Sequence, residues 1–460
     1  MMISSFDSDV HVVGGGLAGS EAAWQLAERG HHVVLHEMRP GRPTPAHKTG
    51  KLAELVCSNT FKSTELSNAH GLLKAEMRAL GSVILWAADQ ARVPGGSALA
   101  VDREVFSQHV HERVGSHPRI TLGHGEVAEL PSPGVIATGP LTSDALAGAI
   151  RARLGIDALA FYDAIAPVVT RESIDESVAY RASRYGKETM PAARDASGAE
   201  VESEGAYLNC PFTREQYDAF LDALSEADQH HGHEFDEVPY FEGCMPVEVM
   251  AKRGRETLRF GPMKPVGLRD PHTGRAPWAV AQLRMEDRAG RMWNLVGFQT
   301  RLRIPEQQRV FRMIPALENA EFLRFGSIHR NSYINSPGAL SPHLALRDDP
   351  RTLFAGQITG VEGYTESAAT GLLAGINLSR LLAGDEAVIP PTTTMLGALY
   401  RYLREADPRH FQPMNANFGL VDDLGEHERD KKVKRERISA RALADLDAWR
   451  TEHAVAGVAR

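Results

Sequence analysis

Apolar and polar positions near the N-terminus follow a pattern that predicts a strand, a helix and a second strand. Residues 9–13, DVHVV, have the composition of a short buried strand. In residues 20–30, SEAAWQLAERG, the apolar side chains fall on one helical face, and the last glycine is placed to end the helix. Residues 32–37, HVVLHE, have the pattern of the second strand. Together these elements predict the start of a Rossmann-like α/β fold.

A glycine-rich segment joins the first strand to the helix and has the spacing of a dinucleotide-binding loop. Residues 14–19, GGGLAG, match the GxGxxG pattern. The first glycine allows a tight turn, the second lets the backbone approach a pyrophosphate, and the third lets the helix pack closely. An acid at the end of the second strand is expected to accept hydrogen bonds from a ribose hydroxyl. The expected cofactor contacts of this unit are Gly14, Gly15, Gly16, Leu17, Ala18, Gly19 and Glu37.

Two later segments favour FAD over NAD. Residues 134–140, GVIATGP, and residues 351–375, RTLFAGQITGVEGYTESAATGLLAG, resemble the later motifs of two-fold flavoproteins, in which a helix N-terminus faces the flavin ring. Those proteins usually have Asp where this chain has Gln357. The alternative is a further strand and helix of the same sheet, which leaves the cofactor open. The expected contacts in these segments are Gly139, Gly356, Gln357, Gly363 and Tyr364.

The chain between these two segments is too long for a loop and predicts an inserted domain, because roughly 200 residues separate them. Alternating runs such as WNLVGFQTRL indicate mixed α and β structure in the insert. The expected fold is therefore a Rossmann-like FAD-binding domain of the two-fold flavoprotein type, interrupted by a mixed α/β domain. The expected divisions are 1–165 and 325–425 for the FAD-binding domain, 166–324 for an inserted substrate domain, and 426–460 for a charged helical tail.

Composition places the chain among globular proteins of two or three domains, with 460 residues, 43% of them hydrophobic and 24% charged. There is no apolar run of about 18 residues, so no membrane span is expected. The first residues lack the pattern of a secretory signal. Three distant cysteines favour a reducing cytoplasm over a disulfide framework, and none forms the CxxC pair of a zinc site. These cysteines are Cys57, Cys210 and Cys244.

Charge is unevenly distributed along the chain. The formal net charge is -8, yet three basic stretches occur at 252–259, 301–309 and 429–441. Each alone is typical of a solvated helix face. Together they indicate an anionic partner such as a nucleic acid.

Several longer motifs carry a family resemblance. AELVCSN at 53–59, FEGCMPVEVMA at 241–251, RNSYINSP at 330–337 and PMNANFGL at 413–420 resemble the folate- and FAD-dependent tRNA uracil-5-methyltransferases. These are related to the flavoproteins that modify the wobble uridine of tRNA. The resemblance implies methylation of the T-loop uridine, U54, in tRNA. It also implies that the carbon comes from 5,10-methylenetetrahydrofolate and that NADPH or NADH supplies reducing equivalents.

The implied chemistry needs a thiolate, because carbon 5 of uracil becomes nucleophilic only after a nucleophile adds at carbon 6. The family uses two thiols. By resemblance, Cys244 is the expected nucleophile, and Cys57 is the second thiol, acting as acid or base or protecting the reactive flavin. The two roles could be reversed. Cys210 is expected to be a packing residue.

Basic residues after Cys244 could lower its pKa or bind a tRNA phosphate, or they could be solvated surface. They are Lys252, Arg253 and Arg255. The alternative functions are a flavin oxidoreductase acting on a small metabolite and a non-catalytic tRNA-binding flavoprotein. The histidines of DQHHGHEF, at 228–235, favour a solvated loop over a metal site.

Overall fold

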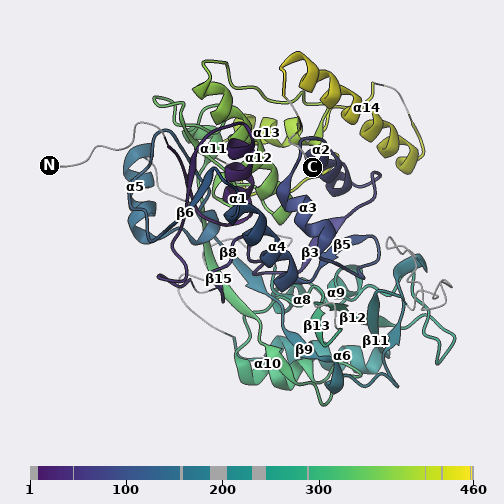
Figure 1. Ribbon diagram of the computed structural model, residues 1–460. Coiled ribbons are helices and arrows are strands. Elements are labelled where there is room, and N and C mark those ends of the chain that lie inside the picture. Colours follow the sequence, from purple (N-terminus) through teal and green to yellow (C-terminus); the bar gives the residue numbers. More distant parts are fainter. Residues whose placement is uncertain are drawn as a thin grey trace, which may run out of the picture.

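Two hydrophobic cores organise the computed structural model, which describes residues 9–44, 46–155, 159–186, 205–229, 245–286, 290–409, 411–425, 428–455 and 457. The elements around the first core occupy the upper part of Figure 1, and those around the second occupy the lower part. The first core combines residues from both ends of the chain, and the second belongs to the middle of it.

A parallel sheet of five strands forms the centre of the first core, in the order β16-β7-β1-β2-β6. Val12 of the central strand is fully buried and pairs with Leu35 and Val135. Strands with both faces covered are typical of parallel sheets, which explains the continuous apolar runs in the sequence. The strands are β1 (Val10–Val13), β2 (Val33–Glu37), β6 (Ile120–His124), β7 (Gly134–Ile136) and β16 (Thr352–Phe354).

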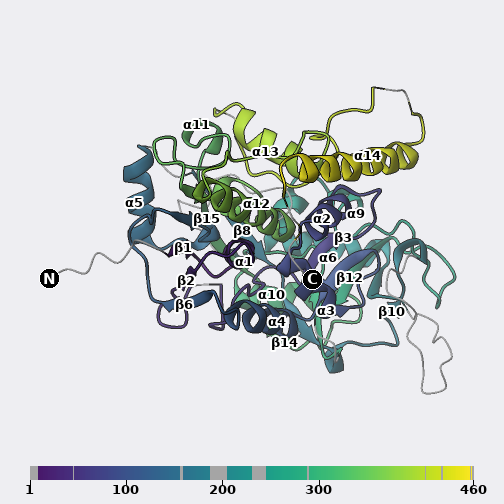
Figure 2. The same ribbon diagram turned by 45° about the horizontal axis from the view of Figure 1, so that its top comes forward.

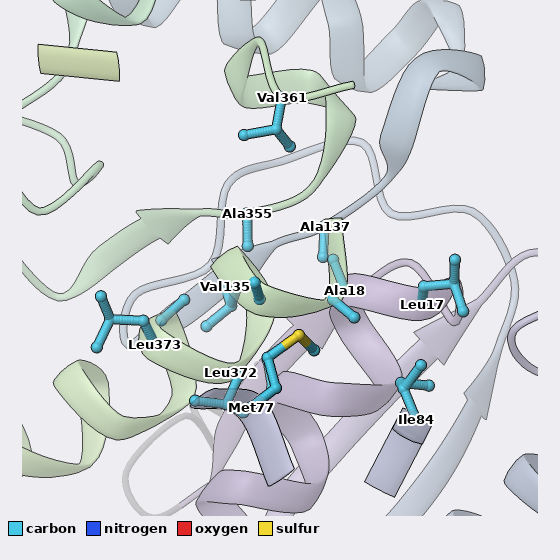
Figure 3. Close-up of a cluster of buried hydrophobic side chains, with 14 of the residues drawn as sticks. Leu17, Ala18, Met77, Ile84, Val135, Ala137, Ala355, Val361, Leu372 and Leu373 are labelled. Carbon is cyan, nitrogen blue, oxygen red and sulfur yellow. The ribbon is translucent and has the colours of Figure 1, made fainter. Parts of the chain in front are cut away.

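Two helices cross closely beside this sheet, α1 (Leu17–Glu28) and α12 (Tyr364–Leu382). A Cβ atom built on Gly371 would lie 2.1 Å from the carbonyl oxygen of Ala18. The observed crossing therefore leaves no space for a side chain at this position. Figure 3 labels side chains of this core from both helices and the sheet, including Leu17, Val135 and Leu372.

Buried carboxylates cap two helices of the first core. The Glu21 carboxylate accepts hydrogen bonds from the Ser82 hydroxyl and from two amides at the start of α3 (Val83–Gln90). The Glu76 carboxylate accepts from the first two amides of α13 (Met395–Glu405), at 2.7 and 2.8 Å. An antiparallel sheet lies beside them in the order β3-β5-β4. The remaining elements of this region are α2 (Ala69–Ala79), α4 (Arg103–Gly115), α5 (Asp144–Leu154), β3 (Thr60–Ser63), β4 (Arg92–Val93) and β5 (Ala98–Val101).

The second core lies against an antiparallel sheet of six strands in the order β10-β11-β12-β13-β9-β14. Three side chains are fully buried within it and therefore contribute to packing: Cys210, Trp293 and Phe298. Its strands are β9 (Val168–Thr170), β10 (Tyr180–Arg181), β11 (Tyr207–Phe212), β12 (Ala279–Met285), β13 (Met292–Leu295) and β14 (Phe322–Arg324). Its helices are α6 (Arg214–Glu226), α8 (Val247–Lys252), α9 (Thr257–Phe260) and α10 (Ile304–Phe311).

An antiparallel pair of strands carries the chain into and out of this middle region. β8 (Leu159–Ile165) pairs with β15 (Ser327–Tyr333) along its full length. The domain boundaries expected from the sequence, at residues 166 and 324, fall beside this pair of strands.

The C-terminal basic stretch forms α14 (Lys431–Glu452), which lies along the outside of the molecule in Figure 2. Ile438, Ala442, Leu446 and Trp449 are buried and join the first core. The helix is therefore part of that core on one side and charged on the other. Among the described residues, none of the helices combines the length and apolar character required to cross a membrane.

Candidate functional site

A cavity opens at the carboxyl ends of the parallel strands β1, β2, β7 and β16. This edge of a parallel sheet is where α/β proteins bind nucleotides. Most of the predicted cofactor contacts line it: Gly14, Gly15, Gly16, Leu17, Ala18, Glu37, Gly139, Gly356, Gln357 and Tyr364. Gly19 and Gly363 lie beside these residues without lining the cavity.

The glycine loop leaves room for a ligand next to its backbone. Gly14 has a φ of +104°, and a Cβ there would lie 2.6 Å from the carbonyl oxygen of Ala137. A Cβ on Gly16 would meet no protein atom within 4 Å, although this residue lines the cavity. A Cβ on Gly19 would lie 1.8 Å from the carbonyl oxygen of Gly14. The first and third glycines are thus required by packing, whereas the second leaves open space for a ligand.

Glu37 is buried at the end of β2 and faces the glycine loop. Its carboxylate accepts a hydrogen bond from the Gly15 amide at 3.2 Å and two from the Arg39 guanidinium at 2.8 and 3.0 Å. Burial opposes ionisation, but the hydrogen bonds and charge of Arg39 outweigh it, so the pKa of Glu37 is lower than usual. The carboxylate is therefore ionised near neutral pH and can accept hydrogen bonds from ligand hydroxyls.

Tyr364, the first residue of α12, holds the loop that carries Cys57. The amides of Cys57 and Ser58 donate to its hydroxyl oxygen at 2.8 and 3.1 Å. Burial, with the nearby Cys57, raises the pKa of Tyr364, so the hydroxyl keeps its proton near neutral pH. Cys57 itself is half-buried and has no disulfide partner. Tyr364 thus lines the cavity and also fixes the segment that carries the Cys57 thiol.

Arg103 holds the same loop from the other side and connects it to the second core. Its guanidinium donates to the carbonyl oxygens of Leu55 and Cys57 at 2.8 and 3.2 Å. It also forms a two-point ion pair with Glu286, which follows β12. Burial disfavours the charge, but Glu286 raises the pKa of Arg103 above its usual value.

Asn59 adds a second connection between the cores. Its side-chain amide donates to the carbonyl oxygen of Met285 at 2.7 Å, and Arg284 donates to its Oδ1 at 2.8 Å. The position of the Cys57 loop therefore depends on how the middle region packs against the first core.

The other predicted thiol, Cys244, lies outside the described residues, as do the histidines of 230–233. The described chain resumes at Met245 and enters α8, where buried Glu248 accepts from the Thr300 hydroxyl and the Arg301 amide at 2.9 and 2.7 Å. In the described residues, no group of three or more metal-binding side chains could hold an ion.

The three predicted phosphate contacts have different surroundings. Lys252 and Arg253 are exposed at the end of α8. Arg255 is also exposed, but its guanidinium forms ion pairs with Asp218 and Asp222 at 3.1 and 2.6 Å. Much of the charge of Arg255 is therefore balanced locally.

Sequence reasoning missed Arg39, Arg103 and Glu286. Arg39 could have been found, because it follows Glu37 by two residues at a strand end. Arg103 ends the motif VPGGSALAVDR at 93–103, which shares the family resemblance but gave this arginine no role, and Glu286 lies in no such motif. Only the fold brings the two residues together. His47 lines the cavity, and Glu362, within the flavoprotein-like segment at 351–375, accepts a hydrogen bond from Gln357 at 2.8 Å.

Comparison with known proteins identifies the family. A family model described as glucose inhibited division protein A matches residues 9–386. The methylenetetrahydrofolate--tRNA-(uracil-5-)-methyltransferase TrmFO of Geobacter sulfurreducens is 57% identical over 442 residues, covering 96% of this chain and 98% of the relative. The chain belongs to this methyltransferase family. The TrmFO of Lactobacillus acidophilus is 51% identical, in an alignment that covers 96% of this chain and 99% of the relative.

The fold has a solved counterpart in the Aquifex aeolicus GidA structure (form II crystal). The two align with a TM-score of 0.66 and 16% identity, over 97% of this chain and 75% of that one. At this identity the likeness concerns the fold alone. The predicted flavoprotein-type α/β fold and the TrmFO family resemblance are both confirmed.

Proposed function

We propose that this protein methylates carbon 5 of a uracil in tRNA, with the carbon drawn from 5,10-methylenetetrahydrofolate. One observation carries the proposal: the loop of a half-buried thiol, Cys57, is held through its backbone by Tyr364, which lines the cavity beside the glycine loop. It occurs in a chain that is 57% identical to a methyltransferase of this class over 96% of its length. The target base proposed within tRNA is the T-loop uridine, U54.

The residues that line the cavity are those expected to hold FAD. The loop from Gly14 to Gly16 would hold the pyrophosphate, since the open space at Gly16 lets backbone amides reach a phosphate. Ionised Glu37 would accept hydrogen bonds from a ribose. Gly356 and Tyr364 would lie beside the flavin ring. FAD, when bound, would supply the hydride chemistry needed to reduce the transferred carbon to a methyl group, and NADPH or NADH is the proposed source of the electrons.

The thiols would activate the uracil. A thiolate adds to carbon 6, and the ring electrons move onto the carbonyl oxygen at position 4 to form an enolate. Carbon 5 then bonds to the methylene carbon as the bond from that carbon to one folate nitrogen breaks, and the electron pair stays on the nitrogen. A base removes the proton from carbon 5, and the bond to the second folate nitrogen breaks, which leaves an exocyclic methylene group and releases tetrahydrofolate. Addition of hydride to this methylene group forms the methyl group, and elimination of the thiolate restores the ring double bond. We assign the addition to Cys244 and the proton transfer to Cys57, whose loop Tyr364 and Arg103 hold in place.

The exposed end of α8 is the proposed contact for tRNA phosphates. Lys252 presents its positive charge to solvent there, and Arg253 is exposed beside it. Arg255 is a weaker contributor than Lys252, because two aspartates already balance its charge.

Transfer of labelled carbon tests the function. The FAD-loaded protein is incubated with unmodified tRNA, a reduced nicotinamide and labelled methylenetetrahydrofolate, and the tRNA is digested to nucleosides. Label in 5-methyluridine at U54 is the expected result. Nicotinamide oxidation with a small-molecule acceptor and no labelled tRNA would instead support an oxidoreductase.

Two cysteine variants separate the roles of the thiols. Cys244→Ala and Cys57→Ala should both retain FAD and lose labelled 5-methyluridine. Cys244→Ala should also lose the covalent complex with a 5-fluorouridine tRNA, which Cys57→Ala should still form. Cys210→Ala, in the second core, is the control that should retain activity. A covalent complex in Cys244→Ala would reverse the assignment.

A further inference from the structure

Three strongly exposed apolar side chains gather on one surface of the protein. Among the large hydrophobic residues of the described chain, the most exposed are Phe260, Tyr185 and Val266, at 79%, 68% and 50%. Phe260 ends α9, and Val266 follows six residues later, so at most about 21 Å of chain separates them. A group of exposed apolar side chains is typical of a binding surface.

Tyr185 joins this surface from a different part of the chain. Its amide donates to the carbonyl oxygen of Gly267 at 3.0 Å, and the Arg184 guanidinium donates to that of Val266 at 2.9 Å. A Cβ on Gly267 would lie 2.9 Å from the Tyr185 ring, so the ring lies against this glycine while most of its surface is exposed. The backbone of Tyr185 is left-handed, with a φ of +58°, which is unfavourable for a bulky residue. The protein therefore holds an aromatic ring at its surface in a conformation that has an energetic cost.

Phe260 lines a surface pocket at the junction of α8 and α9. Met250, Gly254 and Thr257 line the same pocket. A planar group that enters this pocket would therefore contact the Phe260 ring.

The chain around these rings is basic. Residues 252–275 include seven lysines and arginines and two acids, Glu256 and Asp270. Glu256 is paired with an arginine, and the buried Asp270 accepts hydrogen bonds within its own turn. Lys252 and Lys264 are exposed, and neither forms an ion pair within the part of the chain that the structure describes. Both ammonium groups are therefore available to an anionic partner.

Exposed aromatic rings beside available lysines fit RNA with unpaired bases. Each unpaired base has a flat face that stacks on an aromatic side chain, and the phosphate next to it can bind an ammonium group. Bases within a duplex are stacked on each other and cannot reach the rings. A folded protein fits less well, because the buried centre of a protein interface is depleted in charged residues.

We propose that Phe260 and Tyr185 form a stacking platform for unpaired loop bases of the tRNA substrate. Lys252 and Lys264 bind the neighbouring phosphates. This inference rests on the proposed function, in which tRNA is the substrate. The platform follows α8, whose six residues span about 9 Å, and α8 begins three residues after Cys244 in the sequence. RNA on the platform is therefore held close to the chain segment that carries the proposed nucleophile.

Binding of unmodified tRNA to the full-length, FAD-loaded protein tests the platform. Phe260→Ala and Tyr185→Ala should each weaken the affinity about tenfold, because one stacked base is lost, whereas Phe260→Trp should retain it. Phe260→Leu keeps an apolar side chain without a ring and should bind like Phe260→Ala. Met313→Ala removes an exposed apolar side chain after α10 and is the matched control, which should bind like the wild type. Equal affinity in the wild type and Phe260→Ala would overturn the proposal.

Salt dependence and RNA form separate stacking from charge. Phe260→Ala should leave the slope of log tRNA affinity against log salt concentration unchanged, and Lys264→Ala should reduce it by about 0.7 to 0.9. A single-stranded RNA should bind Phe260→Ala more weakly than the wild type, whereas a fully paired duplex should bind both alike. A loss of affinity confined to duplex RNA would refute base stacking.

Stability and self-association are measured on the same proteins. The Phe260 side chain is exposed, so Phe260→Ala should unfold at the same temperature as the wild type. Self-association of the wild type in sedimentation that Phe260→Ala abolishes would assign the surface to a second copy of the chain and refute the proposal. The binding assays contain no folate or nicotinamide. A wild-type protein that binds tRNA but labels none would therefore refute the methyltransferase function, and the affinities of the variants would still decide the role of the platform.

Discussion

Substitution of Gly371 by alanine should loosen the crossing of α12 over α1 and weaken the cofactor site. The new Cβ would lie 2.1 Å from the carbonyl oxygen of Ala18, and ordinary contact requires at least 3.4 Å. The crowded atom belongs to the backbone, so no side-chain rotation can relieve it. The helices must separate, and Ala18 lines the dinucleotide cavity.

The expected loss of stability can be estimated from two opposing effects. Alanine favours a helix by about 1 kcal/mol relative to glycine. Overpacking of a tight contact typically costs about 1 to 3 kcal/mol, and this clash belongs at the upper end because only backbone can move. The net loss is therefore about 1 to 2 kcal/mol. Displacement of the first turn of α1 should also weaken FAD binding.

Thermal unfolding and FAD titration of the same preparation measure both effects. Gly148→Ala in α5 is the matched control, since a Cβ there meets no atom within 4 Å. That substitution should leave FAD affinity unchanged and should stabilise the protein by up to about 1 kcal/mol. A Gly371→Ala protein as stable as the wild type, with unchanged FAD affinity, would show that the helix crossing does not depend on glycine.

Three further predictions concern single groups. Burial raises the pKa of Glu76 to about 8, above the pKa of this side chain in the unfolded chain. The protonated Glu76 side chain should therefore contribute fully to stability below pH 4.5, and this contribution should be lost as the pH rises toward 8. Denaturant unfolding should show this decline, of a few kcal/mol at most, in the wild type and not in Glu76→Gln. Tyr364→Phe leaves two loop amides without their acceptor and should lower the free energy of unfolding by about 1–3 kcal/mol, measured by denaturant unfolding; unchanged stability would contradict this. Lys252→Ala should reduce the slope of log tRNA affinity against log salt concentration by about one unit. The matched Arg255→Ala should change this slope less, because Arg255 is already paired with two aspartates. Equal slopes in the two variants would contradict this difference.

The N-terminal unit was predictable because its signals are local. The strand at 9–13, the glycines and the helix lie within one stretch of sequence, and each has a distinct pattern. The structure places β1 at Val10–Val13 and α1 at Leu17–Glu28, close to these expectations. Local patterns suffice where the contacts that fix an element are themselves local.

The setting of Cys57 could not be predicted in the same way. Its motif indicated chemistry, but the partners of its loop, Tyr364 and Arg103, are distant in the chain. Arg103 in turn depends on Glu286 from the middle region. Contacts of this kind arise from the packing of two cores, and no periodicity or spacing in the sequence records them.

The pairing of β7 with β16 has a consequence for the order of folding. Strand β7 ends at Ile136 and its partner begins at Thr352, so the whole middle region is synthesised before the sheet gains its last strand. Early folding of that region shortens the effective loop that the pairing must close, which reduces its entropic penalty. The cofactor-binding edge is thus completed late during synthesis, and a middle region that folds slowly would delay the uptake of FAD.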